Sequence, residues 1–327
     1  MFPNLFLEPL IMHIPDGFLS PGVAAVCWVL SAALLWVAAR RTRRTLGERQ
    51  VPLMGVMAAF IFAAQMINFP VAGGTSGHLL GGVLAAVMLG PWAGMLVMAS
   101  VIGVQALLFQ DGGLLVMGAN IFNMGILTAL IGYGLYRGVL GRSRRVRLGV
   151  IGLAAWLSVL AGALATSLEL WLSGTAPLRV VLPAMLGVHA LIGIGEALIT
   201  AGAVAFVSRA RPDVLEGTDS PRGGRGWIWG GALASLLVLL LSPLASAYPD
   251  GLERVADDLG FAGRSTAPSI HVLGDYAIPQ LGETPLSVIL AGALGALVVA
   301  ALAYAVSRLL AASPRHQPVD VTEKSDL

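Results

Sequence analysis

The amino-acid sequence predicts an all-α polytopic membrane protein with about nine transmembrane helices. Apolar residues make up 57% of the 327 residues and charged residues only 12%, whereas a soluble domain carries about 25% charged residues. The mean hydropathy is +0.82. Too little polar surface is available to surround a large core, so lipid must cover most of the exterior.

Nine hydrophobic segments follow one another along the chain. One stretch, residues 79–109, is too long for one span and short for two. Gly90-Pro91 lies inside it, and the residue before a proline disfavours helix, so we expect two short helices that meet at this turn. The nine segments are residues 22–39, 51–68, 79–89, 92–109, 114–136, 148–172, 180–208, 227–247 and 286–312.

The basic residues predict how the chain is oriented. If the N-terminus lies outside and the chain crosses nine times, 17 of the 20 Lys and Arg residues fall on the cytoplasmic side. Only Arg179, Arg254 and Arg264 fall outside. The positive-inside rule favours this orientation over its mirror image. We therefore expect a multi-pass protein of the plasma membrane, with its N-terminus outside and its C-terminus in the cytoplasm.

A polar stretch rich in Pro and Gly, residues 209–226, divides the chain into two units. It is expected to be a cytoplasmic linker between a seven-helix unit and a two-helix unit. The chain start lacks the basic residues, length and cleavage site of a signal peptide. The expected parts are an N-terminal extension (1–11), the seven-helix unit (12–208), the linker (209–226), the two-helix unit (227–312) with an outer loop (248–285), and a cytoplasmic tail (313–327).

The composition excludes several classes of function. Cys27 is the only cysteine, so an internal disulfide and a thiolate metal cluster are both excluded. The only lysine is Lys324, and no glycine-rich loop precedes it, so the chain does not bind ATP through a P-loop. The net charge of +2 does not indicate a nucleic-acid partner. An ATP-driven process would require an ATPase supplied by partner proteins.

Two histidines are the first candidates for a binding site. His13 and His78 both fall just outside the predicted membrane spans, each beside a glycine-containing turn. Imidazole suits divalent Ni, Co, Cu and Zn. Two imidazoles on the same side of the membrane therefore predict a metal-ligand pair. The alternative is that each histidine caps a helix end or forms a local hydrogen bond.

Polar residues also fall inside the predicted helices. His189 and Glu196 are seven residues apart on one helix and so lie on about the same face. Such groups are costly in lipid unless they face the protein interior, and a structural pair is favoured over a ligand role. An interior polar face that ties helices together, or an ion path, is predicted for Asn120, Asn123, Gln65, Gln105 and Glu169.

A second class of function is an intramembrane serine protease. Residues 74–77, GTSG, match the G-x-S-G pattern of rhomboid-type proteases, and Ser76 with His189 would form the catalytic dyad. This pattern is short in a chain with 41 glycines. It also leaves the N-terminal motif and the acidic outer loop without a purpose, so the protease is disfavoured.

Longer motifs resemble one family. MHIPDGFLSP at residues 12–21 resembles the N-terminus of the CbiM/NikM family, the substrate-binding membrane subunits of energy-coupling-factor transporters for cobalt and nickel. NFPVAGGTSGHLLGG, which begins at Asn68, resembles the second signature of that family. PDGLE at residues 249–253, with Asp275-Tyr276, resembles the NikN/PDGLE module. Further runs that resemble the family are residues 105–123, 168–174 and 187–200.

The resemblance implies a substrate and its ligands. Ni²⁺ or Co²⁺, as the transported ion, would be held near a square plane by the amine of Met12, the amide and imidazole of His13, and the imidazole of His78. Adjoining chelate rings in a planar nitrogen field favour Ni²⁺ and Cu²⁺. Hydrogen bonds that orient the imidazoles are expected from Asp16 and Ser76. Further candidates for such support, or for an ion path, are Asn68, His189 and Glu196.

The resemblance also implies partner proteins. These would be a CbiQ/NikQ-like transmembrane coupling protein and CbiO/NikO-like cytoplasmic ATPases, which agrees with the missing P-loop. The C-terminal unit would act as an auxiliary subunit whose outer loop helps the metal reach its site. The sequence leaves nickel and cobalt open.

The implied site depends on the start of the mature chain. It needs a free α-amine on Met12, but eleven residues precede Met12, so its nitrogen would lie in a peptide bond. We therefore expect translation to begin at Met12 and the mature protein to begin Met12-His13-Ile14.

Overall fold

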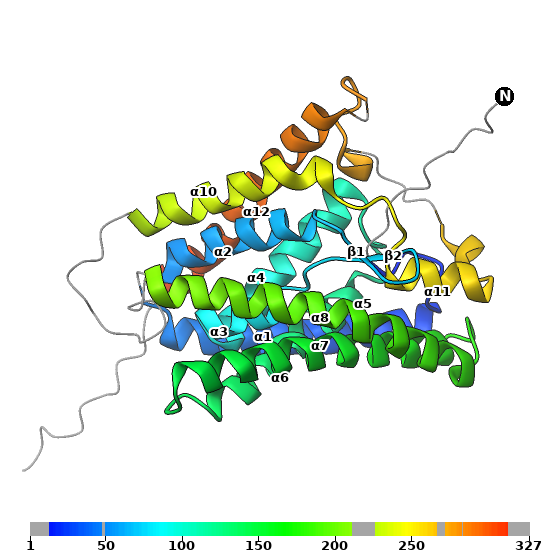
Figure 1. The fold of residues 1–327 in the computed structure, drawn as a ribbon, viewed down its shortest axis with the longest axis horizontal. Coiled ribbons are helices and arrows are strands. Elements are labelled where there is room, and N and C mark those ends of the chain that lie inside the picture. The colour runs from blue at the N-terminus through cyan, green and yellow to red at the C-terminus, as the bar shows by residue number, and fades with distance from the viewer. Residues whose placement is uncertain (1–12, 48–49, 211–225, 267–271, 283, 313–327) are drawn as a thin grey trace, which may run out of the picture.

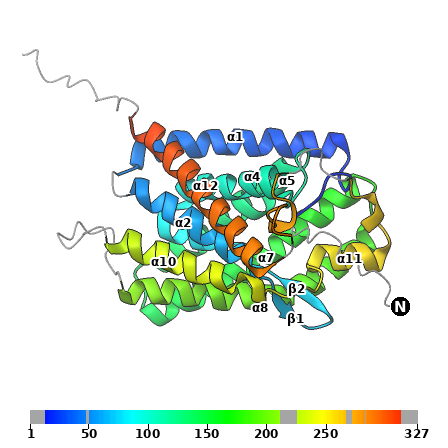
Figure 2. The same ribbon diagram turned by 90° about the horizontal axis from the view of Figure 1, so that it is seen from above.

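The computed structural model describes residues 13–47, 50–210, 226–266, 272–282 and 284–312. Most helices run along the longest axis of the bundle that they form (Figures 1 and 2). The longer helices are α1 (Pro21–Thr45), α2 (Gln50–Gln65), α4 (Pro91–Val104), α6 (Thr128–Arg137), α7 (Arg144–Leu172), α8 (Leu178–Ala210), α10 (Gly226–Leu241) and α12 (Pro285–Ala312). The shorter helices are α3 (Gly82–Leu89), α5 (Met117–Asn120) and α11 (Gly251–Leu259).

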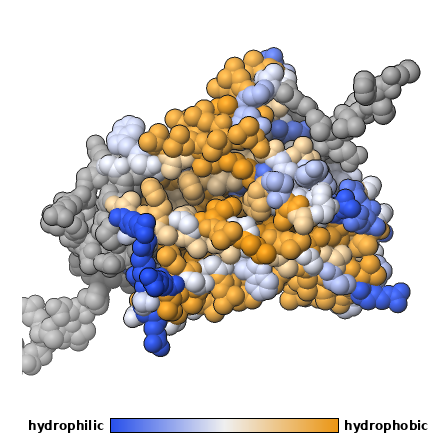
Figure 3. All heavy atoms as spheres, in the orientation of Figure 1, coloured by the Kyte–Doolittle hydropathy of each residue, from blue (hydrophilic) through white to orange (hydrophobic). Residues whose placement is uncertain are grey.

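Two π-helical segments extend or connect some of these helices into longer helical stretches. The segment η1 (Gln105–Phe109) continues α4, and η2 (Ile121–Leu127) joins α5 to α6. Among the described residues, 6 helical stretches are then long and apolar enough to cross a membrane, and the shorter apolar helices Gln50–Gln65 and Ile228–Leu244 accompany them. Apolar side chains cover most of the face in Figure 3, and hydrophilic residues gather at its two ends. The predicted all-α membrane class is confirmed.

The stretch predicted to bend at Gly90-Pro91 does so. Gly90 has φ +82° and separates α3 from α4, and Pro91 occupies the first turn of α4. Helix α3 has 8 residues and is therefore only about 12 Å long, too short to cross a hydrocarbon core of about 30 Å by itself. The predicted helix start at residue 79 is wrong, because α3 begins at Gly82. The chain before it is held outside the helix by Glu196, whose carboxylate accepts hydrogen bonds from the backbone N–H groups of Leu80 and Gly81.

A small β-hairpin lies between α2 and α3. Strands β1 (Phe69–Val71) and β2 (Thr75–Gly77) pair antiparallel, with Pro70 opposite Ser76. The turn between them needs glycine, because Gly73 and Gly74 have φ of +83° and +70°. This hairpin ends one residue before His78 and so fixes where that imidazole lies.

The C-terminal unit packs against the first unit along its length. Helix α2 contacts both α10 and α12, while α7 and α8 pack on each other in the rest of the bundle. The segments that follow α10 also bond to the backbone of the first unit. Backbone N–H groups donate from Ser246 to Asn68, from Thr266 to Asp16, and from Leu273 to Leu108.

The predicted interior polar face is present in two clusters. Gln105 donates to Gln65 at 2.9 Å, and Gln65 donates to the carbonyl oxygen of Leu80 at 2.8 Å. In the second cluster, Asn123 donates to Glu169 at 2.8 Å, and Cys27 donates to the other carboxylate oxygen of Glu169. These bonds join helices that lie far apart in the sequence.

The orientation across the membrane stays a prediction that labelling can check. In a Cys27→Ala background, a cysteine at Ala72 should react with an impermeant thiol reagent added outside intact cells. A cysteine at Arg142 should react only after the cells are opened. Both positions are exposed, so access depends on the side of the membrane and not on burial. Outside labelling at Arg142 would contradict the charge-based orientation.

Candidate metal site

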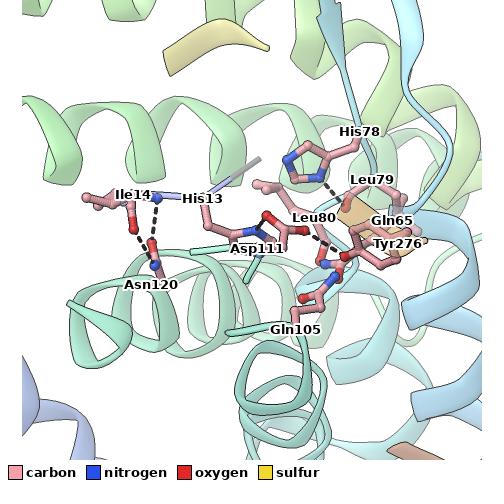
Figure 4. Close-up of polar contacts among 10 residues, drawn as sticks. All are labelled: His13, Ile14, Gln65, His78, Leu79, Leu80, Gln105, Asp111, Asn120 and Tyr276. Carbon is pink, nitrogen blue, oxygen red and sulfur yellow. Dashed lines mark hydrogen bonds and ion pairs between the residues drawn. The ribbon is translucent and has the colours of Figure 1, made fainter. Parts of the chain in front are cut away.

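Two histidines from different parts of the chain lie face to face. The rings of His13 and His78 stack with centroids 5.8 Å apart and planes 27° from parallel (Figure 4). His13 is 2% exposed and His78 is 7% exposed. The predicted pairing of these two imidazoles is therefore present in the fold.

Asp111 holds the imidazole of His13. Its Oδ1 lies 2.6 Å from Nδ1 of His13, and its Oδ2 accepts a hydrogen bond from the hydroxyl of Tyr276 at 2.7 Å (Figure 4). Burial acts to raise the pKa of Asp111, but attraction to His13 and the two hydrogen bonds outweigh it and lower the pKa below its usual value. The carboxylate is therefore charged and accepts a hydrogen bond from the Nδ1–H group of His13. Nε2 of His13 is buried and has no hydrogen-bond partner among the described residues, so in the neutral imidazole it offers a lone pair to a cation.

His78 is held in the same tautomer. Its Nδ1 lies 3.0 Å from the carbonyl oxygen of Leu79. A carbonyl oxygen can only accept, so Nδ1 carries the proton and Nε2 the lone pair. Metal-bound histidines usually donate their other ring N–H to a carboxylate or a carbonyl oxygen. His13 is bonded to a carboxylate in this way and His78 to a carbonyl oxygen.

The backbone around His13 is clamped by side chains of the first unit. The amide of Asn120 both accepts from the N–H and donates to the carbonyl oxygen of Ile14, each at 3.0 Å. The carboxylate of Asp16 accepts from the consecutive backbone N–H groups of Leu114, Leu115 and Val116. A side chain at Gly113 would clash with Asp16 at 2.1 Å, so glycine is required there.

The chain around His78 is held from two sides. Glu196 binds the two N–H groups of Leu80 and Gly81, as described above. On the other side, Ser76 donates its N–H to the carbonyl oxygen of Pro249 at 2.8 Å, and its hydroxyl to that of Tyr248 at 2.7 Å. The C-terminal unit therefore supports the strand that leads into His78.

Both imidazoles line one cavity of about 80 Å³. Its walls come from the His13 loop, the His78 loop, η2, α7 and α8, and also from the PDGLE sequence of the C-terminal unit. Polar lining residues are Asn120, Asn123, Thr166, His189 and Asp250. The cavity thus lies where the two units meet.

The PDGLE sequence has a structural role at nearly every position. Pro249 accepts from Ser76, as above. Asp250 caps α11 in a capping box with Glu253, Leu252 is buried, and Gly251 packs against His189. Burial raises the pKa of Asp250 to about 7. The motif therefore docks α11 over the cavity and places one carboxyl group in its wall.

The other predicted site residues have different partners in the structure. Met12 lies outside the described residues. Asp16 and Ser76 make the backbone hydrogen bonds given above, and their predicted role in orienting the imidazoles stays a prediction. Asn68 accepts a backbone bond from Ser246 through its carbonyl oxygen. Nδ1 of His189 meets the carbonyl oxygen of Met185, whereas Glu196 binds residues 80–81, so the hydrogen bonds of these two residues lead to different partners.

The disfavoured serine–histidine dyad gains no support from these contacts. The hydroxyl of Ser76 donates to Tyr248, and Nδ1 of His189 bonds to a carbonyl oxygen of its own helix. Sequence reasoning missed two residues, Asp111 as the partner of His13 and Tyr276 as the partner of Asp111. One signal was available for Asp111, since it is the only acidic residue between Glu48 and Glu169.

Side chains alone do not complete a metal site. Within the part of the chain that the structure describes, no three His, Cys, Asp or Glu side chains form a group that could hold a metal ion. Two imidazoles therefore need further donors.

Comparison with known proteins identifies the family. The family described as "Cobalt uptake substrate-specific transmembrane region", CbiM, matches residues 13–214, and the PDGLE domain matches residues 225–312. The chain belongs to the CbiM family. The chain joins a CbiM region to a PDGLE region, and several of its relatives are likewise described as fused proteins.

Three similar proteins span most of this CbiM-family chain or its first unit. The fused nickel transport protein NikMN of Rhodobacter capsulatus is 34% identical over 89% of this chain and 96% of its own length. The cobalt transport protein CbiM of Sorangium cellulosum is 34% identical over 63% of this chain and 95% of its own. A crystal structure of a transition metal transporter is 35% identical, with a TM-score of 0.56, and covers 65% of this chain and 100% of its own.

Proposed function

We propose that this chain captures a divalent transition-metal ion, Ni²⁺ or Co²⁺, at the outer face of the membrane for import. One observation carries the proposal: two buried imidazoles face each other on one cavity, and Nδ1 of each is hydrogen-bonded to an oxygen. Nitrogen donors of this kind suit nickel and cobalt. Relatives named as nickel and cobalt transport proteins support the choice of ion.

The proposed ligands include backbone nitrogens beside the imidazoles. They are the imidazoles of His13 and His78, the amide of His13 and the amine of Met12. Among the described residues no three His, Cys, Asp or Glu side chains are grouped to hold a metal ion, which supports additional backbone donors. This ligand set requires that the mature chain begins at Met12, which intact mass of protein made from the native gene would decide. A chain that begins at Met1 would have to use oxygen donors instead.

The ring of His13 has to turn for the complete set to form. A histidine closes a chelate ring with its own amide only through Nδ1, and Nδ1 here bonds to Asp111. We propose that the ion binds Nδ1 in place of Asp111. The proton then resides on Nε2, and Asp111 accepts a hydrogen bond from that N–H group. The carboxylate thus orients the imidazole in both states.

Import would depend on partner proteins. We propose that the chain works with a CbiQ/NikQ-like coupling protein and CbiO/NikO-like ATPases in an energy-coupling-factor importer. The absence of a P-loop from the sequence and the membership in the CbiM family support this arrangement.

The purified chain alone should bind metal but hydrolyse no ATP. In proteoliposomes without partners it should not concentrate Ni²⁺ or Co²⁺. Phosphate release, metal binding and uptake measured on one preparation check this, and cells that express the whole transporter allow competition between the two metals. ATPase activity in a preparation free of partner proteins would overturn the partner proposal, and absence of metal binding would overturn the capture proposal.

A further inference from the structure

His189 is a third imidazole of the cavity, and the proposed ligand set does not use it. Its Nδ1 lies 2.8 Å from the carbonyl oxygen of Met185, one turn earlier on α8. Nδ1 therefore carries the proton and Nε2 the lone pair. His189 has the same tautomer as His78, the form in which Nε2 can bind a metal ion.

The C-terminal unit meets this imidazole at its Nε2 edge. A Cβ added to Gly251 would lie 2.7 Å from Cε1 and 3.0 Å from Nε2 of His189. The backbone of the PDGLE sequence therefore passes directly along that edge. Asp250, the preceding residue, borders the same cavity and is 4% exposed. An imidazole of the first unit and a carboxyl group of the second thus border the same cavity, and Gly251, the residue next to Asp250, packs against the imidazole.

Asp250 is a buried acid whose contacts within the described part of the chain are hydrogen bonds rather than ion pairs. It has no ion-pair partner among the described residues. Its Oδ1 accepts from the N–H of Glu253 at 2.8 Å, which caps α11. Burial without a cation disfavours the charged carboxylate, in keeping with its raised pKa. A divalent ion in the cavity would supply the missing compensation.

We propose a second, weaker site for a divalent transition-metal ion, formed by Nε2 of His189 and the carboxylate of Asp250. The ion occupies it on its way to and from His13 and His78. Two donors hold an ion less tightly than four nitrogens, so the ion can move on. The inference rests on the proposed function, because it assigns a path to the ion that the chain captures.

Two substitutions remove the donors and keep the local bonds. His189→Asn retains an N–H group near the position of Nδ1 for the carbonyl oxygen of Met185. Asp250→Asn retains a side chain that caps helices as well as aspartate does. Asp258→Asn is the matched control, because Asp258 is an acid of the same helix that is 56% exposed and paired with Arg254.

The experiment follows Co²⁺ binding to the full purified chain. Stopped-flow absorbance gives the association rate, and a chelator chase gives the dissociation rate. The double variant should slow the association rate and the dissociation rate by a similar factor, because the ion loses one stop on the same path in both directions. The Kd should stay nearly unchanged, because it is the ratio of the two rates. The Asp258→Asn control should match the unsubstituted chain.

Two results would overturn the inference. Unchanged rates would mean that the ion does not pass these residues. A weaker Kd caused by faster dissociation alone would mean that His189 and Asp250 belong to the tight site. A parallel His78→Ala sample separates this inference from the proposed function. If tight binding survives His78→Ala, the proposed function is wrong. If His78→Ala abolishes tight binding but the double variant keeps unchanged rates, only the second site at His189 and Asp250 is rejected.

Discussion

Replacing His78 with alanine should abolish tight binding of Ni²⁺ and Co²⁺ to the purified chain. The substitution removes one of the two imidazoles that face each other across the cavity. Loss of a residue that only supports a metal ligand costs about 10–100-fold in affinity, so loss of a ligand should cost at least about 100-fold. Equilibrium dialysis or calorimetry with each metal measures the change.

Ser76→Ala is the matched control for His78→Ala. Ser76 lies two residues before His78, on the strand that leads into it, but its hydroxyl bonds to the carbonyl oxygen of Tyr248. Removal of this hydroxyl should leave metal binding largely intact. Any decrease in affinity should at most be the ~10–100-fold that loss of a supporting residue costs. Equal, small losses in both variants would contradict a ligand role for His78. Loss of proteolysis of a membrane substrate in Ser76→Ala would instead favour the rhomboid alternative.

The helices could be predicted because lipid imposes a strong pattern on the sequence. Each of the nine predicted segments contains a helix among the described residues, and the Gly90-Pro91 turn falls where the proline rule placed it. The start of α3 could not be predicted. Glu196 binds Leu80 and Gly81 from a distant helix, and a contact across more than 100 residues leaves no local signal. The hairpin at residues 69–77 was missed for a related reason, since strands of 3 residues show no useful alternation.

The candidate site could be predicted only as far as residue type allowed. Imidazole chemistry indicated His13 and His78, and the fold brings these two together. Asp111 and Tyr276 are 165 residues apart, and no spacing rule connects them with each other or with His13. The isolation of Asp111 in an apolar stretch was the one available clue, because a lone acid there has to be paired.

The PDGLE sequence shows what resemblance adds and what it leaves out. Resemblance identified the motif but gave no physical reason for its residues. The structure supplies reasons: Asp250 caps α11 with Glu253, and Gly251 leaves room for His189. Contacts between two units of a chain depend on how the units dock, which the sequence of either unit does not encode locally.

Asp111→Asn should weaken binding of Ni²⁺ by about 10–100-fold, the usual cost of losing the carboxylate that supports a metal-bound histidine. Asparagine offers one acceptor oxygen, whereas the carboxylate accepts from both His13 and Tyr276. The substitution also removes a negative charge beside the proposed position of the divalent ion. Calorimetry gives the affinity, and the visible absorption band of the bound nickel reports whether its ligand geometry has changed. Unchanged affinity together with an unchanged band would contradict a positioning role for Asp111.

Tyr276→Phe tests whether the C-terminal unit takes part in this positioning. Tyr276 and Asp275 have φ of +54° and +55°, a backbone conformation that costs energy outside glycine and persists only where contacts hold it. The hydroxyl bond to Asp111 is one such contact. Its loss should weaken nickel binding in the same direction as Asp111→Asn but by less, below ~10-fold, because the carboxylate and its charge remain. Tyr248→Phe is the control, since Tyr248 lies in the same unit, is 53% exposed and supports Ser76 through its carbonyl oxygen. A shift of the nickel absorption band in Tyr276→Phe but not in Tyr248→Phe would mean that a residue of the second unit shapes the metal site of the first. A lower melting temperature of Tyr276→Phe with an unchanged band would instead mean that Tyr276 has only a structural role.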